Sequence, residues 1–324
     1  MSIKVVSLLP SAAEIIGLFI AQNNHIKLVG RSHEDDHPHE IVKGVPILTA
    51  AKTKFTTTED IDRQVTQLLS EGNGLYDLNV ELLKELKPDV VVTQDLCHVC
   101  SIDLTTVQRA AKELDPIPTV VTLNPLSIDV MDVISSITDV GTAFNLVTQS
   151  RDIITKLTSR ITYARNLANT ALSRRNGYYH KVAFFEWTAP IYAGGHWTPQ
   201  VIRWCGGAQV INDCKDGQTA QIGAAPSFRV PPENLIKEKP EIVIICPCGL
   251  DLDTTRKEYE NVLKTSEWWP ELMKNVKKLA LVDGNQMFNR PGPRLVDALE
   301  WLTGYINNDE EIIPKDFPWE DIKI

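Results

Sequence analysis

The sequence predicts an α/β fold of two Rossmann-like lobes joined by a long rigid α-helix, with a ligand cleft between the lobes. The first observation is an internal repeat, because residues 83–94 and 235–246 both read as a helix end, then Lys-Pro-acid, then a β-branched run. A proline ends a helix, and a continuous apolar run is typical of a strand buried on both faces. The second observation is a helical pattern without a Gly/Ser linker between the two repeats, which indicates a stiff connection.

The first lobe alternates strands and helices, which favours a largely parallel sheet. Ser11 is the expected N-cap of the first helix, with Glu14 at the capping-box position. The expected strands cover residues 4–8, 27–29, 90–93 and 119–122. The expected helices cover residues 11–19, 60–69, 80–86 and 104–114.

Helical spacing then continues through the middle of the chain. Apolar residues recur on one face through residues 128–140 and again through 153–171, with a break expected near Asn145. The second segment is roughly 40 Å long at the rise of an α-helix, which suffices to bridge two lobes. The basic and Asn-Gly residues at 174–177 suit its C-terminus.

The second lobe restarts with a strand that resembles the first one. Its expected strands cover residues 181–185, 242–245 and 279–282, and its expected helices cover residues 199–205, 254–263, 267–273 and 294–305. The predicted domains are an N-terminal α/β lobe (1–125), a helical region with the bridging helix (126–177), a C-terminal α/β lobe (178–306) and an acidic peripheral tail (307–324).

Composition restricts the classes of partner. The 324 residues are 43% hydrophobic and 23% charged, as in a globular protein, and the net charge of −9 gives no basic field for nucleic acid. The sequence contains no run of about 20 apolar residues, so it predicts no direct membrane insertion. The N-terminus shows no secretory signal, so we expect a cytoplasmic location, where the six cysteines would be thiols or metal ligands.

Cysteines follow both repeated strands, where open α/β sheets bind ligands. Cys97 and Cys100 have a spacing that suits a metal or a redox dithiol, and Cys246 and Cys248 follow the second strand. If the lobes face each other, the four sulfurs would form one site for zinc or iron. The alternative is that they are independent buried thiols.

The loop after the strand at 181–185 is rich in aromatic residues. Trp187, Tyr192 and Trp197 would line a site for a large flat ligand, or else close the core of the second lobe. His33 and His196 follow strands of different lobes, and a neutral imidazole ligates cobalt, iron or zinc. Their alternative role is that of hydrogen-bonding surface histidines.

Three further side chains are candidate ligand contacts. Arg31 and Arg290 would bind phosphate or carboxylate groups through paired hydrogen bonds. Glu186 is expected to accept from a donor on the ligand, although it could also act as an acid or base.

The chain resembles the periplasmic binding proteins for cobalamin and iron–siderophore complexes that serve ABC importers. The resemblance covers about residues 3–306 and rests on the opening Val-Val-Ser-Leu-Leu-Pro-Ser-Ala-Ala-Glu, on Leu-Lys-Pro-Asp-Val-Val at 86–91, and on residues 184–207 and 288–294. A leaderless subgroup carrying Arg-Ser-His-Glu, Asp-Leu-Cys-x-Val-Cys and Gly-His-Trp is most similar. This resemblance implies two α/β lobes, a rigid connecting helix and a ligand clamped without catalysis.

The preferred hypothesis is therefore a binding protein for cobalamin, another corrinoid or a related metal chelate, with an ABC permease as partner if the chain is exported. The predicted ligand contacts are Pro10, Arg31, His33, Glu186, Trp187, Tyr192, His196, Trp197, Asn289 and Arg290. The main alternative is a metal-binding or metal-dependent enzyme that uses the Cys and His loops. A protein-interaction module without a ligand is the third possibility.

Overall fold

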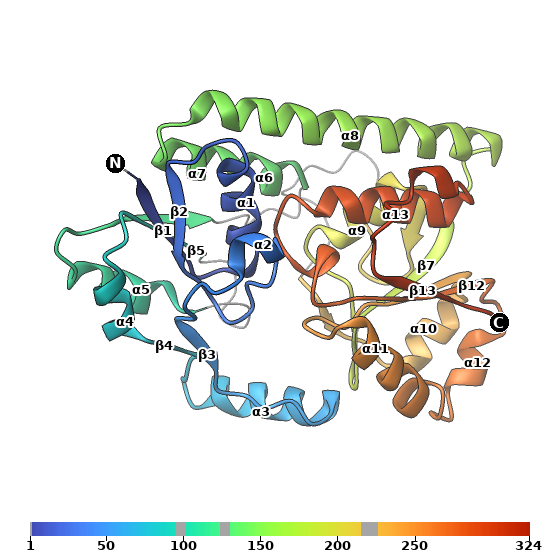
Figure 1. Ribbon diagram of the computed structural model, residues 1–324. Coiled ribbons are helices and arrows are strands. Elements are labelled where there is room, and N and C mark those ends of the chain that lie inside the picture. The colour runs from blue at the N-terminus through green and yellow to red at the C-terminus, as the bar shows by residue number, and fades with distance from the viewer. Residues whose placement is uncertain (1, 95–101, 124–129, 215–225) are drawn as a thin grey trace. The chain divides into compact units, whose positions relative to one another are not determined.

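The computed structural model describes residues 2–94, 102–123, 130–214 and 226–324 (Figure 1). Its contacts divide the chain into two compact units. Unit 1 contains Met1–Leu126 and Val133–Lys156, and unit 2 contains Ser127–Asp132 and Leu157–Ile324. Each unit holds a sheet with parallel strands and helices, which confirms the predicted pair of α/β lobes. The cleft expected between them stays a prediction.

Unit 1 is built on a four-stranded parallel sheet in the order β2-β1-β5-β6. Its strands are β1 (Ile3–Ser7), β2 (Ile26–Gly30), β5 (Val90–Gln94) and β6 (Thr119–Leu123), and its main helices are α1 (Pro10–Ile20), α4 (Val80–Leu86), α5 (Leu104–Lys112) and α7 (Ile137–Ala143). An antiparallel pair, β3 (Thr49–Ala51) and β4 (Tyr76–Leu78), flanks α3 (Thr58–Ser70), and α2 covers His39–Val42. These short strands have no alternating pattern long enough to predict them.

The start of α1 differs from the prediction. Pro10 occupies the first turn and Leu9 is the N-cap residue, so Ser11 lies inside the helix and does not cap it. Proline suits this position because the first N–H groups of a helix have no partner within the helix.

Unit 2 contains a larger mixed sheet in the order β10-β8-β7-β11-β12-β13, with β9 also paired to β7. Its strands are β7 (His180–Thr188), β8 (Ile191–Ala193), β9 (Gly207–Gln209), β10 (Phe228–Arg229), β11 (Ile242–Ile245), β12 (Lys278–Val282) and β13 (Trp319–Ile322). Its helical segments are α9 (Thr198–Trp204), α10 (Pro232–Glu238), α11 (Leu252–Glu258), a π-helical turn (Tyr259–Leu263), α12 (Trp269–Met273), a 3-10 turn (Met287–Asn289), α13 (Leu295–Asn307) and a second 3-10 turn (Glu310–Ile312). The C-terminal segment, expected as a peripheral tail, thus contributes the antiparallel edge strand β13 beside β12.

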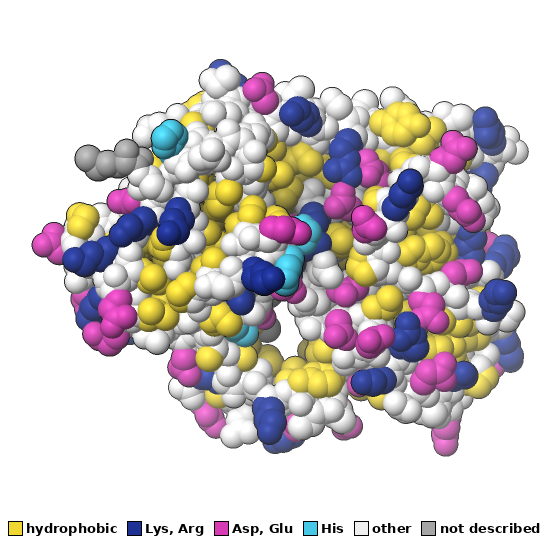
Figure 2. Space-filling view, in the orientation of Figure 1, with side chains coloured by type: hydrophobic (Ala, Val, Ile, Leu, Met, Phe, Trp, Pro, Cys, Tyr) yellow, Lys and Arg dark blue, Asp and Glu magenta, His cyan; other side chains and the backbone are white. Residues whose placement is uncertain are grey.

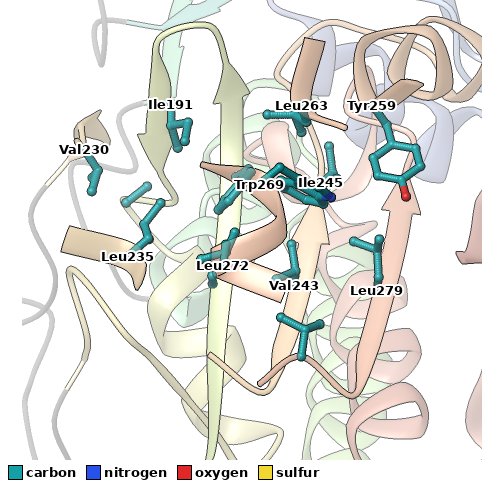
Figure 3. Packing of buried hydrophobic residues seen from close by; sticks show 14 of the residues in the cluster. Ile191, Val230, Leu235, Val243, Ile245, Tyr259, Leu263, Trp269, Leu272 and Leu279 are labelled. Atoms are coloured by element: carbon teal, nitrogen blue, oxygen red, sulfur yellow. The ribbon is translucent and has the colours of Figure 1, made fainter. Parts of the chain in front are cut away.

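One face of the unit 2 sheet is covered by a continuous apolar core. Figure 3 shows Val243 and Ile245 of β11 close to Leu272 and Trp269 of α12. All four side chains are at most 5% exposed. Burying a side chain of this size stabilises a fold by roughly 1.5–3 kcal/mol, so this layer holds α12 on the sheet.

The repeated Lys-Pro-acid motif forms the same corner in both units. Lys87 and Lys239 end α4 and α10 with φ angles of 47° and 53°, and the proline that follows starts the turn into the next strand. We call these turns the Lys-Pro-acid corners, residues 87–89 and 239–241. The left-handed residue stops each helix at the same point relative to its strand.

The acidic residue of each corner joins the strand to its neighbours. The N–H of Asp89 donates to the carbonyl of Lys4 at 2.8 Å, and its carboxylate accepts from the N–H of Lys4 at 2.7 Å. Glu241 makes the same pair of contacts with Lys181, at 2.8 and 3.3 Å. The acid carbonyls then accept from the next strand, through Thr119 and Lys277. The internal repeat therefore reflects one hydrogen-bond pattern used twice.

Between the last strand of the unit 1 sheet and the first strand of the unit 2 sheet, the chain forms two short helices and then a long one. The first, α6, covers Val130–Ser135, and α7 ends at Ala143, close to the expected break, where Asn145 has a φ of 59°. The third, α8 (Val147–Arg174), begins in unit 1 and ends in unit 2. This confirms the predicted long joining helix, although the short α6 also crosses a boundary between the units, at Asp132 and Val133. No helix in the described parts of the chain is both long and apolar enough to cross a membrane.

The C-terminal half of α8 is fixed to unit 2 by charged side chains. Arg160 donates to Glu300 through Nε at 2.8 Å and Nη2 at 2.5 Å, and to Asp297 at 2.5 Å. The guanidinium of Arg165 lies 4.3 Å from the ring centre of Trp204. Paired hydrogen bonds from arginine restrict geometry as well as adding energy, so they fix the rotation of α8 on α13.

We expect Arg160→Ala to lower the stability of unit 2 by about 1–2 kcal/mol, because it removes a three-bond, partly buried ion pair. Thermal unfolding of the purified protein measures this. Arg151→Ala, an exposed arginine earlier on α8, is the control and should leave the midpoint unchanged. Equal effects of both substitutions would contradict this role of Arg160.

Ionised Glu241 should make the free energy of unfolding decrease as the pH falls. Burial opposes ionisation of this carboxyl, but hydrogen bonds from Lys277, Tyr178 and the N–H of Lys181 lower its pKa to about 2. A lowered pKa stabilises the folded state above the usual carboxyl pKa, and this contribution is lost as pH falls toward 2. We expect Glu241→Gln to cost roughly 1–2 kcal/mol at pH 7, allowing for solvent screening, and little near pH 2. Urea unfolding at both pH values tests this, and a cost that is the same at both would contradict it.

Candidate functional site

The end of β7 and the loops that follow β11 and β12 are tied together at the carboxyl edge of the unit 2 sheet. The N–H of Cys248 donates to the carbonyl of Glu186 at 2.9 Å, and Gly249 donates to Gly284 at 2.9 Å. Gly284 is required at this contact, because a Cβ there would lie 1.8 Å from the carbonyl oxygen of Pro247. The backbone of this edge is therefore preorganised.

Glu186 occupies a bulge in β7. Phe185 pairs with Ala193 and Trp187 pairs with Tyr192, so one extra residue stands on β7 between the two pairs. Bulges re-aim a side chain, and here the Glu186 carboxylate accepts from the N–H of Gly195 at 3.1 Å. Burial raises the pKa of Glu186, although hydrogen bonds from Ser227 and Gly195 oppose the shift.

The backbone of Gly195, which donates to Glu186, lies very close to the backbone of Ser227. A Cβ at position 195 would lie 2.0 Å from the backbone nitrogen of Ser227, so glycine alone fits there. Asn212 and Gln209 each donate to the carbonyl of Gly194, at 3.0 and 2.7 Å. These contacts fix the loop that carries His196.

The predicted aromatic residues divide into two groups. Trp187 and Tyr192 are partly exposed neighbours across the β7–β8 hairpin, and Arg229 donates from Nε to the Tyr192 hydroxyl at 2.9 Å. Trp197 is only 6% exposed, and its indole N–H donates to the carbonyl of Phe288 at 2.7 Å. His196 is partly exposed and has a φ of 53°. Trp197 thus packs inside unit 2, while the other three remain accessible.

In the 288–294 segment, the side chain of Asn289 is hydrogen-bonded within unit 2 and Arg290 is buried. The side-chain amide of Asn289 donates to the carbonyls of Gly284 at 2.8 Å and Cys246 at 3.1 Å. Arg290 is 5% exposed. Sequence reasoning missed Asp283, which is also 5% exposed and whose pKa is raised by burial. The sequence feature that could have identified it is an acidic residue directly after the apolar strand at 279–282.

The cysteines of unit 2 differ in their surroundings. Cys246 is fully buried, and desolvation raises its pKa well above the usual range, whereas Cys248 is exposed. Cys97 and Cys100 lie outside the described residues. Among the residues that are described, no group of three or more His, Cys, Asp or Glu side chains is arranged to hold a metal ion. The four-sulfur site stays a prediction.

In unit 1 the loop after β2 carries Arg31 and His33. Arg31 donates from Nη1 to the carbonyls of Asp35 at 2.7 Å and Ser32 at 3.1 Å, so this end of its guanidinium closes its own loop. His33 contacts Thr49 on β3 through both its backbone N–H, at 3.0 Å, and its ring Nδ1, at 2.7 Å. Burial and the charge of Arg31 lower the pKa of His33.

The carboxyl ends of β1 and β5 hold buried polar atoms. Pro10 is partly buried at the first turn of α1. The hydroxyls of Ser11 and Thr93 and the side-chain carbonyl of Gln94 are buried without a hydrogen-bond partner among the described residues. Buried groups of this kind usually have hydrogen-bond partners in folded proteins. Thr93 and Gln94 were missed, although polar residues at the end of an apolar strand were visible.

The sequence-predicted residues therefore gather at the carboxyl edge of each sheet, taken separately. Pro10, Arg31 and His33 lie at that edge of unit 1. Glu186, Trp187, Tyr192, His196, Cys246, Cys248, Asn289 and Arg290 lie at that edge of unit 2. The accessible members combine aromatic surface, an imidazole on each unit and a desolvated carboxyl.

Glu186→Gln should stabilise the protein at high pH. A carboxyl whose pKa is raised by folding binds its proton more tightly in the folded state, so its contribution to stability is lost as pH rises above its usual pKa. The uncharged amide removes that penalty and can still accept from Gly195. We expect a higher melting temperature than wild type at pH 8 and no difference at pH 4. A variant less stable at pH 8 would contradict a desolvated Glu186.

A family model described as periplasmic binding protein matches residues 33–278. The periplasmic heme-binding protein RhuT from Roseiflexus sp. RS-1 matches with a TM-score of 0.63 and 18% identity, over 96% of this chain and 100% of that one. The periplasmic vitamin B12 binding protein BtuF of Vibrio cholerae matches with a TM-score of 0.59 and 14% identity, over 95% and 98%. No curated protein matches the chain.

A third structure, an ABC-type Fe3+-hydroxamate transport system protein from Saccharomonospora viridis, has a TM-score of 0.57 and 12% identity, over 95% of this chain and 92% of that one. At these identities the structures establish the fold. The expected cytoplasmic location is wrong, because the matching family and several matching structures are periplasmic binding proteins. Since the family model covers most of its length, the chain belongs to the periplasmic binding protein family.

Proposed function

We propose that the chain is a binding protein for a metal chelate, contacted by the carboxyl-edge loops of unit 2. The observation that carries the proposal is the accessible pair Trp187 and Tyr192 beside the desolvated carboxyl of Glu186. Sites for small molecules are mostly apolar and aromatic, with a few polar groups that fix orientation. A large ring system with polar substituents fits that combination.

The class of ligand is supported by the names of structurally similar proteins, which bind heme, vitamin B12 or belong to hydroxamate transport. The specific ligand that we propose from the sequence is cobalamin or another corrinoid. Heme and iron hydroxamates are the competing chelates of the same class. Zinc or iron bound directly by cysteines would be a separate site, which depends on Cys97 and Cys100.

A binding role is favoured over the enzyme alternative by family membership, because the family and the similar structures are solute-binding proteins. We also infer a permease of an ABC importer as the macromolecular partner. On the face shown in Figure 2, basic and acidic side chains are interspersed, without one large patch of either sign. A partner on this face would therefore recognise shape and scattered charges.

Native mass spectrometry tests the ligand class. Protein purified without chelator is incubated separately with hydroxocobalamin, hemin and ferrichrome. We expect a one-to-one adduct with at least one of the three that survives mild activation. Absence of any adduct would contradict the proposal, and a bare metal ion in its place would favour the metalloenzyme alternative.

Paired variants test the aromatic contact. Trp187→Ala and Tyr192→Ala each remove accessible aromatic surface, so we expect roughly tenfold weaker binding of the chelate, as one lost contact of about 1.4 kcal/mol implies. Tyr163→Ala is the matched control, because Tyr163 on α8 is 60% exposed. Equal affinity of Trp187→Ala, Tyr192→Ala and wild type would place the ligand elsewhere.

A further inference from the structure

An aromatic cluster in unit 2 combines three oxidisable rings with an acceptor for a proton. The rings are those of Trp301, Tyr305 and Trp319, which we call the aromatic triad. We propose that the triad gives up one electron to a one-electron oxidant in solution, such as an inorganic radical, and stores the oxidising equivalent on Tyr305 as a neutral tyrosyl radical. This redox activity goes beyond the proposed function, and it needs no bound chelate.

The three rings of the triad contact one another in pairs. The rings of Trp301 and Tyr305 are stacked, with centres 5.2 Å apart and planes inclined by 10°. Trp319 meets both of them edge to face, with its ring centre 5.5 Å from that of Trp301 and 5.3 Å from that of Tyr305. The electronic coupling between two rings falls steeply with their separation. Because these rings are in direct contact, an electron passes readily among them and the triad acts as one redox unit.

The triad is assembled from two segments that are distant in sequence. Trp301 and Tyr305 are four residues apart on α13, so their side chains are neighbours on one face of the helix. Trp319 is the first residue of the edge strand β13. The ring of Phe317 stacks on Trp301 at 5.1 Å. A phenylalanine ring is much harder to oxidise than an indole or a phenol, so Phe317 covers the triad without extending it.

Burial gives the triad one accessible end and a dry interior. Trp319 is partly exposed, whereas Tyr305 and Trp301 are buried. An oxidant in solution therefore reaches Trp319 first. A positive charge is costly in an apolar interior, so a radical cation on Trp301 is less favourable than a neutral radical on its neighbour. The oxidising equivalent should accordingly settle on a ring that can release a proton.

Tyr305 is the ring that can release one. Its hydroxyl donates to the carboxylate of Asp321 at 3.3 Å. Burial and the charge of Asp321 raise the pKa of Tyr305, so the phenol still carries its proton when the oxidant arrives. The amine of Lys278 lies 4.9 Å from the ring centre of Tyr305 and disfavours a positive charge on that ring. Electron loss from Tyr305 is therefore coupled to proton loss.

The transfer step is balanced within these groups. The oxidant takes one electron from Trp319 and leaves its radical cation. Tyr305 then gives one electron to that radical cation and its hydroxyl proton to the Asp321 carboxylate. Trp319 is restored, and the products are a neutral tyrosyl radical and a protonated Asp321. Because Asp321 is exposed, it passes the proton on to water.

Pulse radiolysis with the azide radical tests the proposal, because this radical oxidises tryptophan in preference to tyrosine. In wild-type protein we expect the absorption of the tryptophan radical to decay as that of the tyrosyl radical rises, at a rate independent of protein concentration. Tyr305→Phe keeps the stacked ring and should lose most of this tyrosyl signal. Tyr259→Phe is the matched control, because Tyr259 is also buried, with its ring centre 5.8 Å from that of Trp269, and should keep the signal.

A second variant tests the coupled proton. Asp321→Asn removes the carboxylate that receives the Tyr305 proton, so the transfer should become slower than in wild type. The wild-type transfer should also be slower in heavy water. Asp316→Asn, which changes an exposed acid of the same C-terminal segment, is the control and should leave the rate unchanged.

The outcomes separate a redox role from simple core packing. Wild-type protein without the concentration-independent transfer overturns the inference, as does a Tyr305→Phe protein with an unchanged tyrosyl signal. Equal losses in Tyr305→Phe and Tyr259→Phe also overturn it. Circular dichroism shows whether each variant is folded. If Tyr305→Phe does not fold, Asp321→Asn decides the question, because it changes only an exposed side chain, and an unchanged rate in it overturns the inference.

Discussion

The two Lys-Pro-acid corners are the constraint on which both sheets depend. Each corner stops a helix with a left-handed lysine, and its acidic residue bonds the first strand of the sheet through both its backbone and its carboxylate. Its carbonyl accepts from the third strand. Three strands are therefore aligned by one residue. Because parallel strands in register end at the same edge, the corners at the amino edge also determine where the loops at the carboxyl edge emerge.

The opposite edge of unit 2 is organised differently, since loops there must remain accessible. Backbone hydrogen bonds between the end of β7 and the loops after β11 and β12 supply rigidity, and Gly195 and Gly284 permit approaches that any side chain would block. This arrangement desolvates the carboxyl of Glu186, which destabilises its charged form. Functional sites commonly retain groups with shifted pKa values. The raised pKa of Glu186 contrasts with the lowered pKa of Glu241, whose hydrogen bonds outweigh its burial and stabilise its charged form.

Family membership and local geometry answer different questions. The fold establishes that the chain is a member of a family of binding proteins, but folds of this kind carry many ligands. The discrimination among chelates depends on individual atoms. The proposed ligand class rests on the partly exposed aromatic surface of the hairpin pair Trp187 and Tyr192.

The sequence by itself determined the two-lobe α/β plan, the joining helix and the sheet edges that carry the candidate residues, because periodicity and proline punctuation are local signals. Only the tertiary structure decided which of those residues are accessible. Trp187 and Trp197 are both tryptophans of one loop region, yet Trp197 is bonded to Phe288, 91 residues away. The hydrogen bond between the His33 ring and Thr49 and the pairing of β13 with β12 likewise join segments that are far apart in the sequence. Contacts between residues distant in sequence leave no pattern within either segment, so they could not be predicted from it.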